Sequence, residues 1–325
     1  MVASVTSVAI LIDTFAQDCH TNNMQSTGNS PLPEGILKPM LCKDAPKDAA
    51  GLPRLPAVRD KWMMERKLDG WRFLFHVAGE GSVQSYGGRN GSLYDSAALD
   101  DLAIEIGARL PPGSIVDSEV VVVDGQHSAQ VSTVLANPRA GLLRAVVFDV
   151  LMVNGEDVRR LAWKDRRRLL DVVSFDPYGP VRTSEVHPID RAVYEQWLAE
   201  GAEGAVVKQV DHSYQSGKRS SGWLKLKPQA TADAVIVSIE KGKGSTNRHV
   251  AGAFGIQMLD GDELGVLSSI SVKDNAQALE AAEHPDRFLG RIIEIKHHGL
   301  FPSGVPRHPQ FLRFREDREG WPTSQ

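Results

Sequence analysis

The chain has 325 residues, of which 42% are hydrophobic, and a formal net charge of −4. This length suits two domains of about 100–200 residues each, and the composition excludes a disordered or fibrous protein. Cys19 and Cys42 are the two cysteines and show no zinc-ligand spacing, so they indicate neither a disulfide framework nor a structural zinc site and favour a reducing, cytoplasmic compartment.

Residues 1–36 are expected to form an N-terminal arm, either a short added element or a mobile segment. Their apolar stretch, residues 2–12, is too short to span a bilayer and lacks the basic residues that precede the apolar core of a secretion signal. We therefore expect no membrane association. Residues 22–56 are rich in Asn, Ser, Gly and Pro, which favours loops, so the compact body is expected to begin near Leu37.

Strand-like and helical patterns alternate from residue 37 to residue 228, which predicts a domain of the α+β class. Apolar, β-branched runs predict strands at residues 71–77, 115–123, 145–153 and 205–210. Amphipathic patterns predict helices at residues 96–110, 160–173 and 189–200.

The pattern changes over residues 229–325, where four strands and one helix are predicted. The strands are expected at residues 232–239, 253–259, 264–272 and 291–296, and the helix at residues 274–283. This order is typical of a small β-barrel of the OB-fold type. Residues 208–248 hold eight Lys and Arg against three acidic residues, so a basic face for nucleic acid is available despite the net charge.

The segment Glu65-Arg66-Lys67-Leu68-Asp69-Gly70-Trp71-Arg72 is the most informative part of the sequence. A lysine amine attacks phosphorus only when it is unprotonated, so we expect neighbouring cations and a metal ion to lower the pKa of Lys67. Gly70 would let the backbone pass close to a nucleotide. Taken alone, however, Asp-Gly is also a common hairpin turn.

Lys67-Leu68-Asp69-Gly70-Trp71-Arg72 resembles the KxDGxR motif of the covalent nucleotidyltransferases, the superfamily of DNA ligases, RNA ligases and mRNA capping enzymes. Later segments resemble further motifs of that superfamily in the same order, over most of residues 38–318. The chain most resembles a compact ATP-dependent DNA ligase. That resemblance implies an ATP-grasp-like nucleotidyltransferase domain with mixed and antiparallel sheets over residues 37–228, followed by an OB-fold domain over residues 229–325.

The resemblance also implies roles for the first two motifs. Lys67 would carry AMP, with Asp69 and Arg72 as further catalytic residues and with Arg72 contacting both nucleotide and nucleic acid. Glu65 matches the position associated with adenine recognition, which favours ATP over GTP. Arg89 in Arg89-Asn90-Gly91 would grip the 5′-phosphate at a nick, although Asn-Gly is also a hairpin turn and both interpretations can hold.

The middle motifs would supply the metal site and the adenine platform. Asp117-Ser118-Glu119-Val120 resembles the motif whose glutamate, here Glu119, serves the ribose and the metal, and Glu203 would be a second metal-binding carboxylate. Two glutamates suit Mg²⁺ or Mn²⁺. Phe148 would lie against the adenine ring, whereas an isolated Phe in such a strand is more often ordinary core.

The last motifs would bind phosphates. Lys225 and Lys227 are two residues apart, so in a strand they would point to one face and converge on one phosphate group, although a lysine edge that prevents aggregation is the alternative. Arg313 and Arg315 would orient the leaving pyrophosphate. Residues 228–233 are the expected hinge between the domains.

The sequence thus predicts a monomeric enzyme that uses ATP to seal 5′-phosphate/3′-hydroxyl nicks in duplex DNA. The reaction would pass through a lysyl-AMP and a DNA-adenylate. Two alternatives stay open: an RNA ligase or capping-type guanylyltransferase, and a noncatalytic OB-fold protein that only binds nucleic acid.

Overall fold

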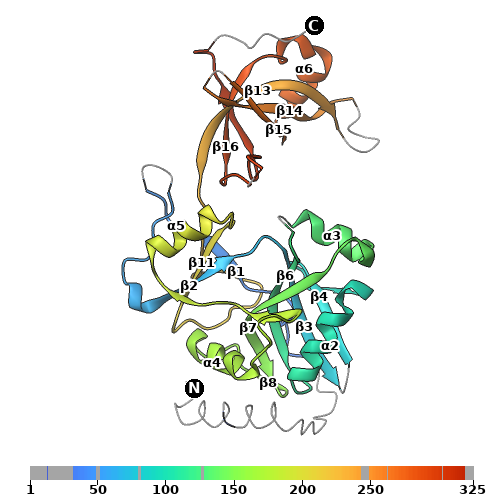
Figure 1. Cartoon of the computed structure of the whole chain (residues 1–325), viewed down its shortest axis with the longest axis vertical. Coiled ribbons are helices and arrows are strands. Elements are labelled where there is room, and N and C mark those ends of the chain that lie inside the picture. The colour runs from blue at the N-terminus through green and yellow to red at the C-terminus, as the bar shows by residue number, and fades with distance from the viewer. Residues whose placement is uncertain are drawn as a thin grey trace. The chain divides into compact units, whose positions relative to one another are not determined.

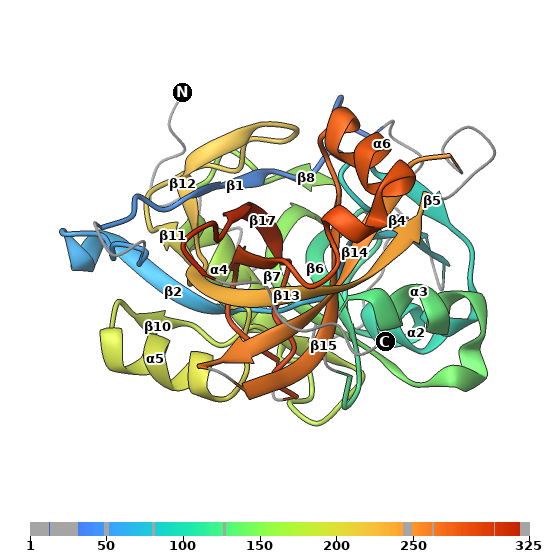
Figure 2. The ribbon, with the colours of Figure 1, turned by 90° about the horizontal axis from the view of Figure 1, so that it is seen from above.

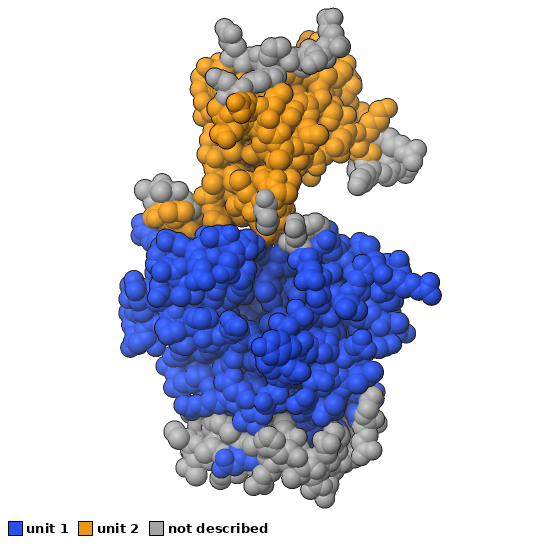
Figure 3. All heavy atoms as spheres, viewed as in Figure 1, with its two compact units in different colours: residues 1–46, 54–226 blue, residues 47–53, 227–325 orange. Residues whose placement is uncertain are grey.

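The computed structural model describes Asp13 and residues 32–48, 52–79, 82–125, 128–242, 249–261, 263–301 and 303–318. It contains two compact units (Figure 3). Unit 1 comprises Met1–Pro46 and Arg54–Leu226, and unit 2 comprises Lys47–Pro53 and Lys227–Gln325. Most of the expected N-terminal arm, together with Cys19, lies outside the described residues.

Unit 1 contains two sheets (Figure 1). The first has five strands in the order β1 (Leu41–Asp44), β12 (Arg219–Leu226), β11 (Gly204–Gln209), β2 (Trp62–Lys67) and β10 (His187–Pro188). The second has seven strands: β5 (Ser92–Tyr94), β4 (Ser82–Gly87), β3 (Trp71–Gly79), β6 (Ile115–Val122), β7 (Leu143–Val153) and β8 (Glu156–Asp157) in order, with β9 (Val181–Thr183) also paired to β7. All pairings are antiparallel except β1 with β12 and β7 with β9.

Helices cover the outer face of each sheet in unit 1. Apolar side chains of α2 (Asp100–Arg109), α3 (Ala129–Ala136) and α4 (Trp163–Val173) pack on the seven-stranded sheet, and those of α5 (Arg191–Ala199) pack on the five-stranded sheet. Among the described residues of this unit, short 3-10 helices lie at Arg59–Lys61, Ala97–Leu99 and Pro138–Ala140. Asp190 caps α5, because its side chain accepts a hydrogen bond from the amide of Ala192.

The inner faces of the two sheets meet in a separate core, which follows from the two-residue period of strands. In β3 the buried Phe73 and Phe75 pack toward the helices, whereas Leu74 between them packs toward the other sheet. Trp223 of β12 reaches the same inner core from the opposite side. The space between the sheets therefore receives side chains from both.

Among its described residues, unit 2 has a five-stranded antiparallel sheet and the helix α6. Figure 2 shows α6, β13, β14, β15 and β17 from above. The strand order is β15 (Glu263–Ser271), β14 (Ala251–Asp260), β13 (Ala230–Lys241), β16 (Ile292–His297) and β17 (Gln310–Phe314). Helix α6 (Asn275–Glu283) follows β15, and a 3-10 helix spans Pro285–Arg287. The core of this unit includes Ile236, Phe254, Ile256, Phe288 and Ile293.

The predicted strands and helices are all present, with ends shifted by a few residues, and the structure differs from the expectations at three places. Residues 41–44 form β1 within the expected loop, because they pair with β12. Residues 160–162 lie before the start of α4. Residues 230–233 belong to β13 and pair with β16, so only the first two residues of the expected hinge lie outside strands.

Candidate active site

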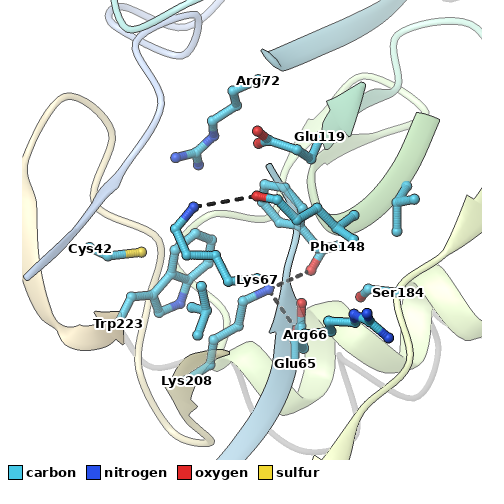
Figure 4. A pocket seen from close by; sticks show the side chains of 13 residues that line it. Cys42, Glu65, Arg66, Lys67, Arg72, Glu119, Phe148, Ser184, Lys208 and Trp223 are labelled. Carbon is cyan, nitrogen blue, oxygen red and sulfur yellow. Dashed lines mark hydrogen bonds and ion pairs between the residues drawn. The ribbon is translucent and has the colours of Figure 1, made fainter. Parts of the chain in front are cut away.

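A pocket opens between the two sheets of unit 1 (Figure 4). Its charged lining comes from β2, β3, β6 and β11, and its aromatic lining comes from β7 and β12. The lining side chains are those of Cys42, Glu65, Arg66, Lys67, Leu68, Arg72, Glu119, Val146, Phe148, Ser184, Val206, Lys208 and Trp223. Five residues predicted for the site line this pocket, namely Glu65, Lys67, Arg72, Glu119 and Phe148, and Glu203 contacts Lys67 beside it.

Lys67 ends β2 and its amine lies beside two glutamates. The Nζ atom is 2.5 Å from Oε2 of Glu203, which is only 4% exposed. Burial alone would favour the neutral amine, but the attraction of Glu203 and Glu119 outweighs it and raises the pKa of Lys67 above its ordinary value. The expected lowering of this pKa by cations and a metal ion is therefore not produced by the protein's own charges, because the nearest of these are the two carboxylates.

Gly70 is required by a close contact within the protein. A Cβ atom at this position would lie 2.2 Å from the carbonyl oxygen of Val120 in β6. The Gly70 amide donates a hydrogen bond of 3.1 Å to Oε1 of Glu119, one residue before Val120. Gly70 thus brings the loop after Lys67 against β6 and holds the Glu119 carboxylate in place.

Glu119 and Glu203 have the chemistry of a site for a hard divalent cation. Burial raises the pKa of Glu119 to about 7, and the Glu203 carboxylate on the other side of Lys67 acts in the same direction. Two carboxylates that converge in a buried place favour a bound cation, and Mg²⁺ commonly takes one or two protein carboxylates together with phosphate oxygens. Among the described residues no group of three or more His, Cys, Asp or Glu side chains is placed to hold a metal.

Arg72 of β3 is fixed by three partners. Its Nε and one terminal nitrogen donate to the two oxygens of Asp117, at 2.8 and 2.5 Å, and its other terminal nitrogen donates to the carbonyl of Met40 at 2.6 Å. The hydroxyl of Tyr214 donates to Asp117 at 2.6 Å and accepts from Arg72 at 3.2 Å. The guanidinium therefore has a single orientation at the pocket wall.

Glu65 belongs to a buried ion pair at the far end of the pocket. Its Oε1 is 2.7 Å from Nζ of Lys208, and both side chains are at most 5% exposed. Burial raises the pKa of Glu65 despite this partner. Lys208 also donates to the carbonyl of Phe148 at 3.0 Å, and its amine lies 4.6 Å from the centre of the Phe148 ring. Figure 4 shows Phe148 and Trp223 on the walls around this pair.

Asp69 and Arg89 lie outside the residues that line the pocket. Asp69 is half-buried in the connection between β2 and β3. Arg89 is exposed in the turn between the antiparallel strands β4 and β5. The hairpin interpretation of Asn90-Gly91 is therefore confirmed, and the proposed phosphate contact of Arg89 is compatible with it.

The predicted phosphate-binding side chains are divided between the two units. Lys225 is half-buried near the end of β12, with Nζ 3.2 Å from Asp44, while Leu226 packs in the core beneath the sheet. Lys227 follows β12 and belongs to unit 2. Arg313 and Arg315 also belong to unit 2, where Arg313 pairs with Glu294 at 2.7 Å and Arg315 with Asp233 at 2.7 Å.

Sequence reasoning assigned no role to Lys208, Asp117 or Tyr214. Of these three, Lys208 could have been recognised from the sequence. It stands two residues after Val206 in an apolar strand, so the two side chains point to the same face of the sheet. Tyr214 follows β11 in a loop, and nothing in its local sequence indicates that its hydroxyl reaches Asp117 across 97 residues of chain.

A lysine amine flanked by carboxylates, with a buried acid and aromatic rings behind it, defines a site of the nucleotidyltransferase type. The chain belongs to the ATP-dependent DNA ligase family, because the model of the ATP-dependent DNA ligase domain matches residues 39–227. A probable DNA ligase of Beutenbergia cavernae is 29% identical over 87% of this chain and 60% of its own length. A DNA ligase of Methanospirillum hungatei is 31% identical over 80% of this chain and 52% of its own length. This chain therefore spans about half to three-fifths of these relatives.

Solved structures show the same fold. A Lig E DNA ligase superimposes with a TM-score of 0.57 at 19% identity, covering 85% of this chain and 99% of that one. The ligase domain of LigD from M. tuberculosis gives a TM-score of 0.52 at 22% identity, covering 89% of this chain and 98% of that one.

In the part of this chain that the structure describes, none of the helices has the length and apolar character needed to cross a bilayer.

Proposed function

We propose that this chain is an ATP-dependent DNA ligase that seals 5′-phosphate/3′-hydroxyl nicks in duplex DNA. The observation that carries the proposal is the position of the Lys67 amine, 2.5 Å from Glu203 at the mouth of a pocket with an aromatic and acidic interior. The match of residues 39–227 to the ATP-dependent DNA ligase domain agrees with this chemistry.

In the first step, the free amine of Lys67 attacks the α-phosphorus of ATP, forming a P–N bond while the bond to pyrophosphate breaks. Phe148 and Trp223 would enclose the adenine, and Glu65, held by Lys208, would accept a hydrogen bond from its amino group. Glu119 and Glu203 would hold a Mg²⁺ or Mn²⁺ ion, which would supply positive charge beside the phosphate. Positioning and charge stabilisation dominate such phosphoryl transfers.

The two later steps use the same pocket. AMP passes from Lys67 to the 5′-phosphate of the nick, and the adjacent 3′-hydroxyl then attacks that phosphate and releases AMP. Arg72, oriented by Asp117, would contact the nucleotide and the DNA strand at this stage, while Arg89 would bind the 5′-phosphate.

The division of labour between domains belongs to the same proposal. Residues 37–228 would form the adenylyltransferase domain and residues 229–325 an OB-fold domain. The five antiparallel strands of unit 2 support an OB-type barrel. Arg313 and Arg315 would orient the pyrophosphate, and Lys225 and Lys227 would bind phosphate oxygens, with the protein acting as a monomer.

The decisive experiment is incubation of the protein with α-labelled ATP and Mg²⁺, followed by mapping of the labelled residue. We expect one adenylate on Lys67, its loss in Lys67→Ala and its retention in Lys61→Ala, a control in the 3-10 helix before β2. Label from GTP instead, or sealing of nicked RNA but not nicked DNA, would support an RNA ligase or a capping-type enzyme. Unchanged labelling of Lys67→Ala would contradict the assignment of the nucleophile.

A further inference from the structure

Two arginines adjoin the pocket on the inner face of the seven-stranded sheet. Side chains along β7 alternate, so that Leu143, Ala145 and Val147 are buried against the helices. Val146 and Phe148 point instead into the nucleotide pocket, and Arg144 shares their face. Arg144 is the second residue of β7 and is paired with Val121 of β6.

Arg182 reaches the same face from the edge strand β9. It is the register partner of Val146, while Val181 before it packs in the helix-side core. Ser184, two residues further on, lines the nucleotide pocket in Figure 4. Because β9 runs parallel to β7, Arg144 and Arg182 are diagonal neighbours on one face, within reach of long side chains.

Within the described residues, each of these cations keeps one buried donor without a hydrogen-bond partner. Both side chains are half-buried, and the Nε atom of each is buried with no hydrogen-bond partner among the described residues. Burial lowers the pKa of Arg144, and the positive charge of Arg182 lowers it further, with Asp124 as the opposing charge. Two repelling guanidinium groups with buried, unpaired donors are costly in a folded protein unless an anion joins them.

We propose that Arg144 and Arg182 form an anion subsite next to the nucleotide pocket, which binds a backbone phosphate of the nicked duplex. Neither arginine lines the pocket itself, so the anion they bind lies beyond the nucleoside. A guanidinium presents planar paired donors that match phosphate oxygens, and backbone phosphates are the anions that extend past a nucleotide held at a nick. This inference rests on the proposed ligase function.

The test compares the double variant Arg144→Gln/Arg182→Gln with the double variant Arg109→Gln/Arg168→Gln. The control removes the same charge from α2 and α4, on the opposite face of the sheet. Three quantities are measured for each protein: the rate of lysyl-adenylate formation from ATP, the Kd for a nicked duplex over a range of salt concentrations, and the melting temperature.

We expect the Arg144/Arg182 variant to form lysyl-adenylate at the wild-type rate but to bind the nicked duplex about tenfold more weakly for each arginine replaced. The slope of log affinity against log salt should fall by about 0.9 for each phosphate contact removed. The melting temperature should stay equal or rise, because the repulsion is relieved. The control should match the wild type in all three.

Three outcomes would overturn the inference. Unchanged nick affinity and salt slope would show that no DNA phosphate binds there. Slower adenylation with normal nick binding would assign the anion to the triphosphate of ATP. A lower melting temperature would show that the two arginines stabilise the fold. If the wild type itself forms no lysyl-adenylate, the proposed function fails, which is distinguishable from all three.

Discussion

Single residues in this site act through contacts that tolerate little change. Gly70 lies so close to Val120 that a methyl group has no room, and its amide holds Glu119 beside Lys67. Deeper in the unit, Arg166 and Asp149 form an ion pair at 2.7 Å in which both side chains are at most 1% exposed. The two cases differ in cause, one steric and one electrostatic, and each gives a prediction.

Gly70→Ala should slow adenylation of Lys67 and destabilise unit 1. The added Cβ must push the loop away from β6, at a cost of about 1–3 kcal/mol typical of overpacking, and this movement would break the hydrogen bond to Glu119. Gly79→Ala is the matched control, because a Cβ at Gly79 has nothing within 4 Å. Adenylation kinetics and urea denaturation measure both effects. Equal behaviour of the two variants would refute the steric argument.

Arg166→Leu should lower the free energy of unfolding by about 3–5 kcal/mol, because it leaves the carboxylate of Asp149 buried without its cation. The neighbouring Arg168→Leu, at a side chain that is 64% exposed, should change it by no more than about 0.5 kcal/mol. Urea denaturation followed by tryptophan fluorescence compares them. A loss below about 1 kcal/mol in Arg166→Leu would mean that water or another group compensates Asp149.

At the scale of elements, the loop between β11 and β12 caps the N-terminus of α4. The amides of Trp163 and Lys164, which have no partner within the helix, donate to the carbonyls of His212 and Val210, both at 2.9 Å. His212 also lies 2.7 Å from Ser220 of β12 through its Nε2 atom. The loop thus joins a helix to the five-stranded sheet.

This arrangement predicts a contribution of His212 to the pH dependence of stability. Burial, and then the charge of Arg166, lower the pKa of His212. Between the ordinary histidine pKa of about 6.5 and the lower folded value, the unfolded chain binds a proton that the folded chain does not. The contribution is therefore fully present above about pH 6.5 and is lost as pH falls.

The measurement is the free energy of unfolding of the wild type and of His212→Gln from neutral pH to about pH 5. The wild type should lose more stability on acidification than the variant. The difference between the two pH profiles removes the contributions of other groups. One of these is Glu119, whose raised pKa changes stability with pH in the opposite direction. Parallel profiles of unfolding free energy against pH in the two proteins would show that His212 does not contribute to this pH dependence.

At the scale of the whole molecule, the net charge is −4, and the pocket contains both cations and carboxylates. Arg89 is exposed in its hairpin, and Lys67, Arg72 and Lys208 line or approach the pocket. The three pocket cations are paired with Glu203, Asp117 and Glu65, so binding of a polyanionic duplex falls to cations outside these pairs, such as the exposed Arg89.

Binding of a nicked duplex should accordingly weaken steeply with salt. Each phosphate neutralised by Lys or Arg releases counterions and adds about −0.9 to the slope of log affinity against log salt, so six contacts would cost about a thousandfold between about 50 and about 200 mM. Filter binding or fluorescence anisotropy over that range measures the slope. An affinity independent of salt would exclude binding through phosphates.

Much of the site could be predicted from sequence because its residues occur in short segments. Lys67 and Glu65 share one strand two residues apart, so both point into the same pocket, and Phe148 stands in a strand whose alternation is visible. Several long strands and helices were predictable for the same reason, since their periodicity is local, whereas β2, β4, β12 and α3 were not predicted. Short edge strands such as β1, β9 and β10 were missed because a partner strand, and not their own sequence, makes them strands.

The sequence by itself indicated Lys67 as the candidate nucleophile, Glu119 and Glu203 as candidate metal ligands and the positions of several strands and helices, because motifs and side-chain periodicity are written in consecutive residues. Only the tertiary structure decided that Glu203 lies 2.5 Å from Lys67, that Tyr214 and Asp117 fix Arg72, and that Arg144 and Arg182 share one face of the sheet. Those relations join residues far apart in the chain. Their electrostatic consequences depend on distance and burial, which exist only once the sheets have formed.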